Sequence, residues 1–370
     1  MAPIKKIRSE RGDAILRKAD YFAGIPLAFV GAIYRKLASF TPPDDIREIG
    51  LFCPGAIGDL VLLSALIDGL LKKLPGARAE LIVTKSNADC AELIPGVSAR
   101  AFDIRRPARI IAHMASKKYD LLFDACQWAR IGAIVSAFSG ARRTIGFVTK
   151  GQARGWGYDY PVIHRDDRHE IENFLALGRA LWPELNGQPR LSIKAAGDGE
   201  KIIVCHAFPA PGRGRPLKLW PGDNWAEFVR MALEAGYDAA LTGSGEDAET
   251  AEKFILKYFP REKRVYSVAG KWSFAELARN LTRSSGLVSV NTGIMHLGAA
   301  LGIPVIGLHG PTNPLRWGPV GPKTAALLPD RGRNAYLNLG FEYPRGAKNN
   351  MAGIRPGVVF ATLLRLIAAN

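Results

Sequence analysis

The sequence predicts an α/β protein made of two doubly wound domains, each with a parallel sheet. The first observation is the length of 370 residues, which is more than one ordinary domain needs. The second is that short apolar, β-rich runs alternate with amphipathic stretches through both halves of the chain. A composition of 48% hydrophobic and 23% charged residues suits a globular chain with sizeable cores.

The expected elements follow this alternation. In the first half we expect strands near residues 48–53, 79–84, 119–124 and 143–147, and helices near 59–73 and 167–182. In the second half we expect strands near 201–205, 237–242, 286–290 and 303–308, and helices near 223–235, 246–258, 273–283, 293–301 and 354–368. Such sheets bind ligands at the carboxyl ends of their strands, so a cleft between the domains is the expected site.

A polar segment with glycine and proline, residues 185–200, predicts the connection between the domains. We therefore divide the chain into a basic and apolar N-terminal helical extension, a first domain, a second domain and a C-terminal helix. Packing of that last helix back on the first domain is one option. The four parts span residues 1–45, 46–190, 200–352 and 353–370.

Cysteine usage and charge limit the function classes. The four cysteines lie far apart, which argues against a disulfide framework or a zinc knuckle and favours a reducing compartment: Cys53, Cys90, Cys126 and Cys205. The formal net charge of +16 indicates an acidic partner, namely nucleic acid, an anionic membrane surface or phosphorylated substrates. No nucleic-acid-binding motif is visible, and charge alone does not choose among these partners.

The N-terminal part contains an apolar run, "YFAGIPLAFVGAIY" at residues 21–34, with basic residues before and after it. The run is too short to span a bilayer. Pro26 interrupts it and no clear small-residue cleavage site follows, which argues against a signal peptide. Two interpretations remain open: a helix lying on an anionic membrane interface, or a helix packed on the first domain.

The stretch "LFCPGAIGDLVLLSALIDGLL", residues 51–71, begins like a nucleotide-binding turn. Its strand ends at Gly55, and Gly58 precedes an amphipathic helix. Backbone amides at such a turn attract phosphate, yet the next residue is the carboxylate of Asp59. A helix-capping aspartate is the alternative explanation.

The strongest signal is "SVNTGIMHLGAALGIPVIGLHGPTNPLRWGP", residues 289–319. The amides of Thr292 and Gly293 would face an anion at a helix start, and the helix dipole would reinforce them. Capping by Asn291 and Thr292 explains the start of this helix. It does not explain His296 on the first turn, or the loop at residues 310–314.

Two further loops carry weaker signals. Residues 206–225 place Arg213, Arg215 and Lys218 in a cationic loop, with Asp223 as the expected cap of the next helix; a solvated basic loop is the alternative. Residues 241–252 follow a strand with Gly243 and Glu246. This glutamate would accept hydrogen bonds from ribose hydroxyls, or would only complement the helix dipole.

Taken together, these stretches resemble the ADP-heptose:lipopolysaccharide heptosyltransferases, the ninth family of glycosyltransferases. The resemblance covers roughly residues 47–330, in order. The most specific part runs from Asn291-Thr292-Gly293 through His296 to Gly310-Pro311-Thr312; Gly58-Asp59 and Lys218-x-Trp220-Pro221 follow in specificity. The resemblance implies a GT-B fold, with two Rossmann-like domains facing across a cleft.

The family also implies roles for single residues. Asp59 would be the general base on the acceptor side, kept ionised and accessible by its glycine-lined helix start beside Gly55 and Gly58. The donor diphosphate would bind Lys218, Thr292, Gly293, His296 and Thr312, and the donor nucleoside and sugar would bind Gly243, Glu246 and Asn291. Transfer would be single-step and inverting, with no cofactor and no metal.

The resemblance favours an ADP-sugar donor and a lipid-linked or lipopolysaccharide-core acceptor, handled in the cytoplasm at the inner face of the membrane, and no nucleic acid. The chain departs from the family at Asn291, where an aspartate is usual. The sugar is therefore either heptose or a related hexose or uronic acid. Other departures are Ala65 and a C-terminal tail without cysteines.

Rival functions remain. A sugar-nucleotide epimerase has the same architecture and needs no acceptor. A non-catalytic nucleotide- or glycan-binding homologue would explain Asn291 as decay. A nucleic-acid-binding protein would need the basic residues on one face. A nicotinamide dehydrogenase is poorly supported, because the first turn lacks Gly-x-Gly-x-x-Gly.

Overall fold

A computed structural model describes residues 18–369, except for residues 19, 39, 150, 194–198, 213 and 339–342. The chain forms two compact units, which we describe separately. The first comprises residues 1–165 and 170–190, and the second comprises residues 166–169 and 191–370.

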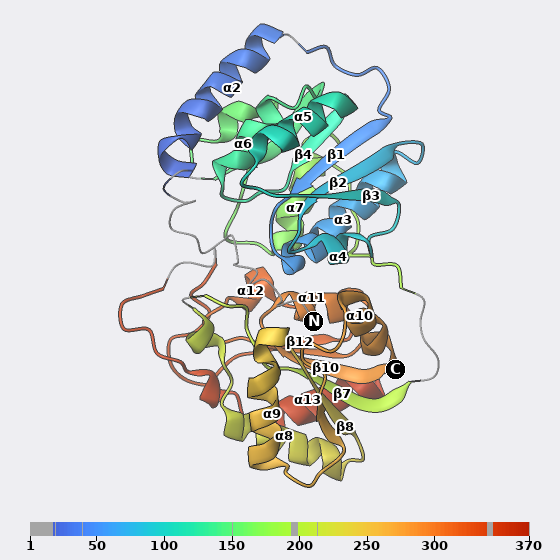
Figure 1. The fold of residues 1–370 in the computed structure, drawn as a ribbon, viewed down its shortest axis with the longest axis vertical. Helices are drawn as coiled ribbons and strands as arrows, with labels where there is room; N and C mark the ends of the chain where they lie inside the picture. Colours follow the sequence, from blue (N-terminus) through green and yellow to red (C-terminus); the bar gives the residue numbers. More distant parts are fainter. Residues whose placement is uncertain are drawn as a thin grey trace. The chain divides into compact units, whose positions relative to one another are not determined.

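The first unit contains a parallel sheet with six strands among the described residues, in the order β3-β2-β1-β4-β5-β6. Figure 1 labels β1, β2, β3 and β4 of this sheet. This is the strand order of a Rossmann fold. The strands are β1 (Glu48–Cys53), β2 (Arg78–Thr84), β3 (Val97–Phe102), β4 (Leu121–Asp124), β5 (Arg143–Val148) and β6 (Tyr160–Ile163). The helices are α2 (Gly24–Ala38), α3 (Ile57–Lys73), α4 (Ala88–Ala91), α5 (Pro107–Lys117), α6 (Arg130–Ala137), the short 3₁₀ helix η2 (Gly155–Gly157) and α7 (Glu170–Arg179).

The second unit repeats this architecture, and its described strands pair in parallel in the order β12-β11-β10-β7-β8-β9. They are β7 (Glu200–His206), β8 (Asp238–Thr242), β9 (Val265–Ser267), β10 (Ser284–Val290), β11 (Val305–Leu308) and β12 (Thr324–Leu327). The helices are α8 (Gly222–Glu234), α9 (Ala248–Tyr258), α10 (Phe274–Arg283), α11 (Gly293–Ala300), α12 (Pro314–Trp317) and α13 (Pro356–Ala368), with 3₁₀ turns η3 (Arg215–Lys218), η4 (Gly245–Asp247) and η5 (Met351–Gly353).

The predicted α/β fold with two doubly wound sheets is confirmed, and each strand expected from the sequence coincides with an observed one. The sequence missed β3, β6, β9 and β12. These four strands are the edges of the two sheets, and they are short or largely exposed. An edge strand has fewer apolar neighbours to bury, so its sequence carries a weaker apolar signal.

Helix α2 packs against α6 through small residues. Its buried positions include Gly24, Ala28 and Gly31, which recur at helical spacing on one face. A Cβ atom added at Gly31 would lie 2.7 Å from the Cβ of Ala137, so glycine is what permits this close approach. At the start of the helix, Asp20 pairs with the buried Arg130 at 2.9 Å.

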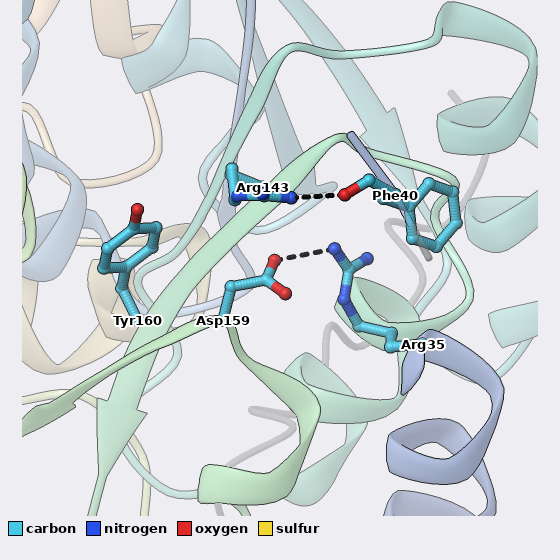
Figure 2. A pocket seen from close by; sticks show the side chains of 5 residues that line it. All are labelled: Arg35, Phe40, Arg143, Asp159 and Tyr160. Atoms are coloured by element: carbon cyan, nitrogen blue, oxygen red, sulfur yellow. Dashed lines mark hydrogen bonds and ion pairs between the residues drawn. The ribbon is translucent and has the colours of Figure 1, made fainter. Parts of the chain in front are cut away.

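Arg35 holds the other end of α2. Its guanidinium lies 2.6 Å from Asp159 Oδ2 and donates to the Ala141 carbonyl at 3.1 Å, while the Phe40 ring covers it at 4.7 Å. Figure 2 shows these side chains with Arg143 and Tyr160 around a pocket of about 390 Å³. Helix α2 is therefore packed on the first domain, as one of the two interpretations of residues 21–34 required.

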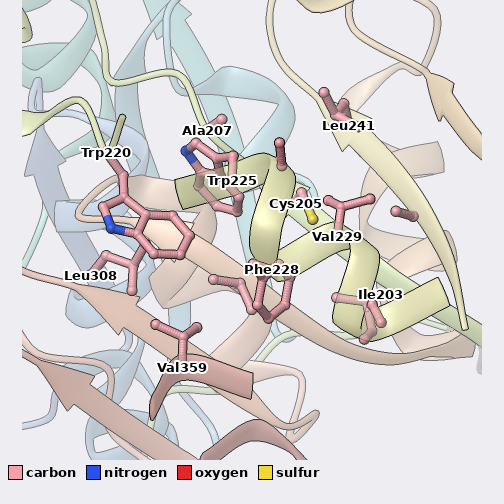
Figure 3. Close-up of a cluster of buried hydrophobic side chains, with 14 of the residues drawn as sticks. Ile203, Cys205, Ala207, Trp220, Trp225, Phe228, Val229, Leu241, Leu308 and Val359 are labelled. Carbon is pink, nitrogen blue, oxygen red and sulfur yellow. The ribbon is translucent and has the colours of Figure 1, made fainter. Parts of the chain in front are cut away.

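The core of the second unit is centred on Trp220, Trp225 and Phe228 (Figure 3). The two indole rings meet edge to face, 4.8 Å between centroids. The C-terminal helix that we considered for packing on the first domain packs here instead. Its residues Val359 and Leu363 are fully buried in the same cluster, because α13 lies against α8 and the second sheet.

Candidate functional site

In the first unit, the candidate site is the turn between β1 and α3. Asp59 lies in the first turn of α3, where its Oδ2 accepts from the Ala56 amide at 2.9 Å. Its Oδ1 accepts from the side-chain amide of Gln127 at 3.2 Å. The aspartate is only 4% exposed, so it is less accessible than the sequence led us to expect. Capping and a chemical role are compatible, because each carboxylate oxygen has a second lone pair.

Glycine is required beside this carboxylate. A Cβ atom at Gly55 would lie 2.6 Å from Asp59 Oδ2, which is closer than real Cβ contacts allow. The second glycine of the turn, Gly58, is the second residue of α3 and is partly buried. The turn thus lets the backbone approach the carboxylate closely, and it fixes the direction in which the carboxylate points.

Gln127 is a residue of this site that sequence reasoning missed. It lies in the loop after β4 and is 5% exposed. Its backbone carbonyl accepts from the Thr149 hydroxyl at 2.8 Å, at the end of β5. A single glutamine in a loop has no periodicity and no motif, so nothing in the sequence distinguishes it.

Asp124, at the end of β4 just before this loop, belongs to a buried network with Arg154 and Tyr158. The Arg154 guanidinium is 2.6 Å from Asp124 Oδ2, and the other Asp124 oxygen accepts from the Cys126 amide at 2.8 Å. Paired buried charges of this kind are costly to disrupt, because removing one partner leaves the other unpaired. The network therefore fixes the loop that carries Gln127.

In the second unit, Trp220 positions Lys218. The indole nitrogen of Trp220 donates to the Ile354 carbonyl at 3.0 Å, and the ring is buried in the core. Lys218 ends η3 two residues earlier and is half-buried. Its positive charge is among the groups that lower the pKa of His309.

His309 links three of the predicted residues, although the sequence analysis did not select it. Its Nδ1 lies 3.2 Å from the Thr312 hydroxyl, and it follows β11 as a fully buried side chain. Burial, more than any charge nearby, lowers its pKa to about 3. Burial likewise lowers the pKa of His296 to about 3, with further contributions from His169 and His309. Both imidazoles are therefore neutral near pH 7.

The start of α11 lacks a side-chain cap. Thr292 occupies the N-cap position, but its side chain makes no capping hydrogen bond; its hydroxyl lies 3.3 Å from that of Ser289. Gly293 is the first helical residue. His296 is 5% exposed, and its Nδ1 has no hydrogen-bond partner among the described residues. Uncapped amides and an unsatisfied imidazole are suited to a polar ligand.

Asn291 has a structural role that the sequence did not reveal. Its side-chain nitrogen donates to the Trp317 carbonyl at 3.0 Å, at the end of α12. A carboxylate cannot make this donation. The family's usual aspartate could therefore not make the contact by which Asn291 holds the end of α12.

The turn after β8 differs in part from expectation. Glu246 is exposed, whereas the neighbouring Asp247 is buried, accepts from the Ser244 amide at 2.9 Å and pairs with Arg215 at 2.6 Å. A Cβ atom at Gly243 would lie 2.8 Å from the Asp247 Cβ, so this glycine permits the tight turn.

The sequence analysis also selected Asp223 and Arg213 at the loop before α8. Asp223 is not the cap of α8, because the helix begins at Gly222 after Pro221 and Asp223 accepts from the Tyr258 hydroxyl at 2.6 Å. Arg213 lies outside the described residues.

Over the described part of the chain, no cluster of three or more His, Cys, Asp or Glu is arranged to hold a metal ion. The four cysteines are buried and form no disulfide bond with one another.

Comparison with known proteins gives a consistent result. The family described as glycosyltransferase family 9 (heptosyltransferase) matches residues 107–338. Lipopolysaccharide heptosyltransferase 2 of Salmonella typhimurium is 27% identical over 70% of this chain and 82% of its own length. Lipooligosaccharide heptosyltransferase 2 of Haemophilus influenzae is 30% identical over 46% of this chain, which spans about half (49%) of that relative. The solved structure of Escherichia coli ADP-heptose lipopolysaccharide heptosyltransferase II has a TM-score of 0.72 at 19% identity, covering 87% of this chain and 99% of that one.

The buried histidines predict a pH dependence of stability. His296 and His309 have folded-state pKa values of about 3, below the ordinary value of 6.5. Their contribution to the free energy of unfolding is complete above pH 6.5 and is lost as the pH falls toward 3, because in this range only the unfolded state binds protons at these histidines. Between pH 7 and about 4.5, the free energy of unfolding should fall less steeply with decreasing pH in His309→Gln than in wild type, by up to ~1.4 kcal/mol per pH unit. Urea unfolding at each pH measures this dependence. Equal slopes would contradict the burial of a neutral His309.

Replacing Asn291 by aspartate should destabilise the second unit. The change removes the donation to the Trp317 carbonyl and turns a carboxylate oxygen toward it, at a cost of roughly 1–3 kcal/mol. Urea unfolding measures this. The matched control is Asn186→Asp, because the Asn186 side chain acts as an acceptor from the Gly187 amide and aspartate preserves that bond. A stable Asn291→Asp variant would show that the Trp317 contact is dispensable.

Proposed function

We propose that this chain, which belongs to glycosyltransferase family 9, transfers a sugar from an ADP-sugar to a lipopolysaccharide core or another lipid-linked glycan of the cell envelope. The observation that carries the proposal is the start of α11, which has no side-chain cap and holds the buried His296 with an unsatisfied Nδ1, together with the Thr312 hydroxyl 3.2 Å from the buried His309. The charge of Lys218 acts on the same His309 imidazole. The relatives support the donor and the acceptor, because they include an ADP-heptose enzyme and lipopolysaccharide heptosyltransferases.

On the donor side, the amides of Thr292 and Gly293 and the ammonium of Lys218 bind the diphosphate. The positive end of α11 and the lysine neutralise the charge that develops as this group leaves. His296 is neutral, so it contributes a polar nitrogen without a charge. The Thr312 hydroxyl is oriented by His309.

The remaining donor contacts concern the nucleoside and the sugar. The exposed Glu246 accepts from ribose hydroxyls beside the tight turn at Gly243, and Asn291 offers its carbonyl oxygen to the sugar. The sugar is heptose or a related hexose or uronic acid, since an amide replaces the family's usual carboxylate.

On the acceptor side, Asp59 is the general base. It takes the proton of an acceptor hydroxyl while that oxygen forms a bond to the anomeric carbon and the bond from this carbon to the diphosphate breaks. A single displacement of this kind inverts the anomeric configuration. The Ala56 amide and Gln127 each hold one carboxylate oxygen, which orients the base without protonating it. No metal is needed in this scheme, because Lys218 and the helix dipole carry the charge.

We place the reaction in the cytoplasm, at the inner face of the cytoplasmic membrane where a lipid-linked acceptor is accessible. Two rival activities are separable by experiment. An epimerase would convert the donor without any acceptor. A non-catalytic homologue would bind ADP and release no product with any acceptor.

Asp59→Asn should abolish measurable transfer while leaving affinity for ADP nearly unchanged. The substitution keeps the shape of the side chain but removes the base, which is typically worth a factor of 10²–10⁴ in rate. Gln127→Ala should lower kcat less severely, because the base remains but is less well oriented. A transfer assay and calorimetric titration of ADP measure both effects. An equal loss of ADP affinity in Asp59→Asn would make Asp59 a donor contact or a structural cap.

Lys218→Ala should weaken ADP binding by about 10- to 150-fold, because a charge-assisted contact is worth roughly 1.5–3 kcal/mol. Lys253→Ala is the matched control, since Lys253 is an exposed lysine of α9 paired with Glu249. Calorimetry on the two variants gives the comparison. Undiminished affinity of Lys218→Ala would remove this lysine from the donor site.

A further inference from the structure

Helix α2 has an unusual outer face for a protein surface. Its small-residue face is used against α6, and the opposite face would ordinarily be polar. Residues 21–34 contain no charged side chain. The exposed large apolar residues between positions 21 and 37 are Tyr21, Phe22, Leu27, Phe29, Val30, Ile33, Tyr34 and Leu37.

The apolar surface continues beyond α2. Trp156 of η2 is 51% exposed and meets Phe29 edge to face, with ring centroids 5.9 Å apart. We call Trp156 and the eight exposed residues of the α2 segment the apolar ridge. A contiguous exposed surface of this kind marks an interaction site, whereas scattered single apolar residues do not. Tryptophan and tyrosine are the side chains enriched where apolar and polar media meet.

The charges around the ridge favour an anionic partner. Lys18 and Lys36 are exposed at its two ends. The acid nearest to the ridge in sequence, Asp20, is paired with Arg130 on the domain side. The whole chain carries a net charge of +16. Within the described ranges no helix has the length and apolar character needed to cross a membrane.

We propose that the apolar ridge docks on an anionic lipid bilayer, with α2 lying in the interface and its lysines among the headgroups. The helix is at once a packed element of the first unit and its membrane contact, so both interpretations of residues 21–34 hold together. The docking rests on this surface alone. Only its use in presenting an acceptor rests on the proposed function.

The test is flotation of the full chain with vesicles of phosphatidylethanolamine and phosphatidylglycerol, compared with pure phosphatidylcholine vesicles. Phe29→Glu should reduce binding to the anionic vesicles about tenfold, because it places a charge in the apolar ridge. Leu256→Glu is the matched control, since Leu256 is an exposed leucine of α9 in the second unit (67% exposed) and should change binding less than about twofold. Lys18→Glu with Lys36→Glu should remove the preference for anionic vesicles, as should high salt.

Point substitutions are preferable to deletion of residues 1–40, because deletion would uncover α6 and leave Asp159 without Arg35. An unchanged melting temperature of Phe29→Glu verifies that α2 stays packed. The proposal is overturned if wild type does not float with anionic vesicles, or if Phe29→Glu floats equally well. It is also overturned if light scattering shows a dimer that Phe29→Glu dissociates, while flotation shows no vesicle binding. ADP affinity, measured on each variant, tests the proposed function independently of these outcomes.

Discussion

The site depends on one constraint, which is that all described strands of each sheet run parallel. In a parallel sheet every strand ends at the same edge, so loops distant in sequence meet there. In the first unit this brings Asp59 after β1 beside Gln127 after β4 and Thr149 after β5. In the second unit it brings Thr292 after β10 to the same edge as His309 after β11.

Burial of polar groups decides which side chains are charged at the carboxyl ends of the strands in both sheets. The first unit buries an ion pair, Asp124 with Arg154, and thereby keeps a loop in place. The second unit buries the imidazoles of His296 and His309, which lowers their pKa values to about 3, so they remain uncharged near pH 7. The positive charge of Lys218 acts on one of these neutral imidazoles, that of His309. In the proposed function, the same charge would stabilise a diphosphate.

Much of the fold could be predicted from the sequence, because buried central strands are continuous apolar runs. The edge strands could not, since β3 and β6 are largely exposed and β9 and β12 are only three and four residues long. At the site, glycine turns and a lysine in a known motif were visible, whereas Gln127 and His309 act through contacts that only folding creates. Asn291 is intermediate: its position was evident, but its donation to the Trp317 carbonyl required the structure.

The bond from Trp220 to the Ile354 carbonyl has a consequence for synthesis of the chain. A nascent chain emerges from its N-terminus, so all strands of the first sheet are made well before Ile354. The loop carrying Lys218 is different, because Trp220 beside it is anchored on Ile354, 134 positions further along the chain. The second unit can therefore reach its final form only after Ile354 has been made, and the order of translation makes it the later of the two to mature.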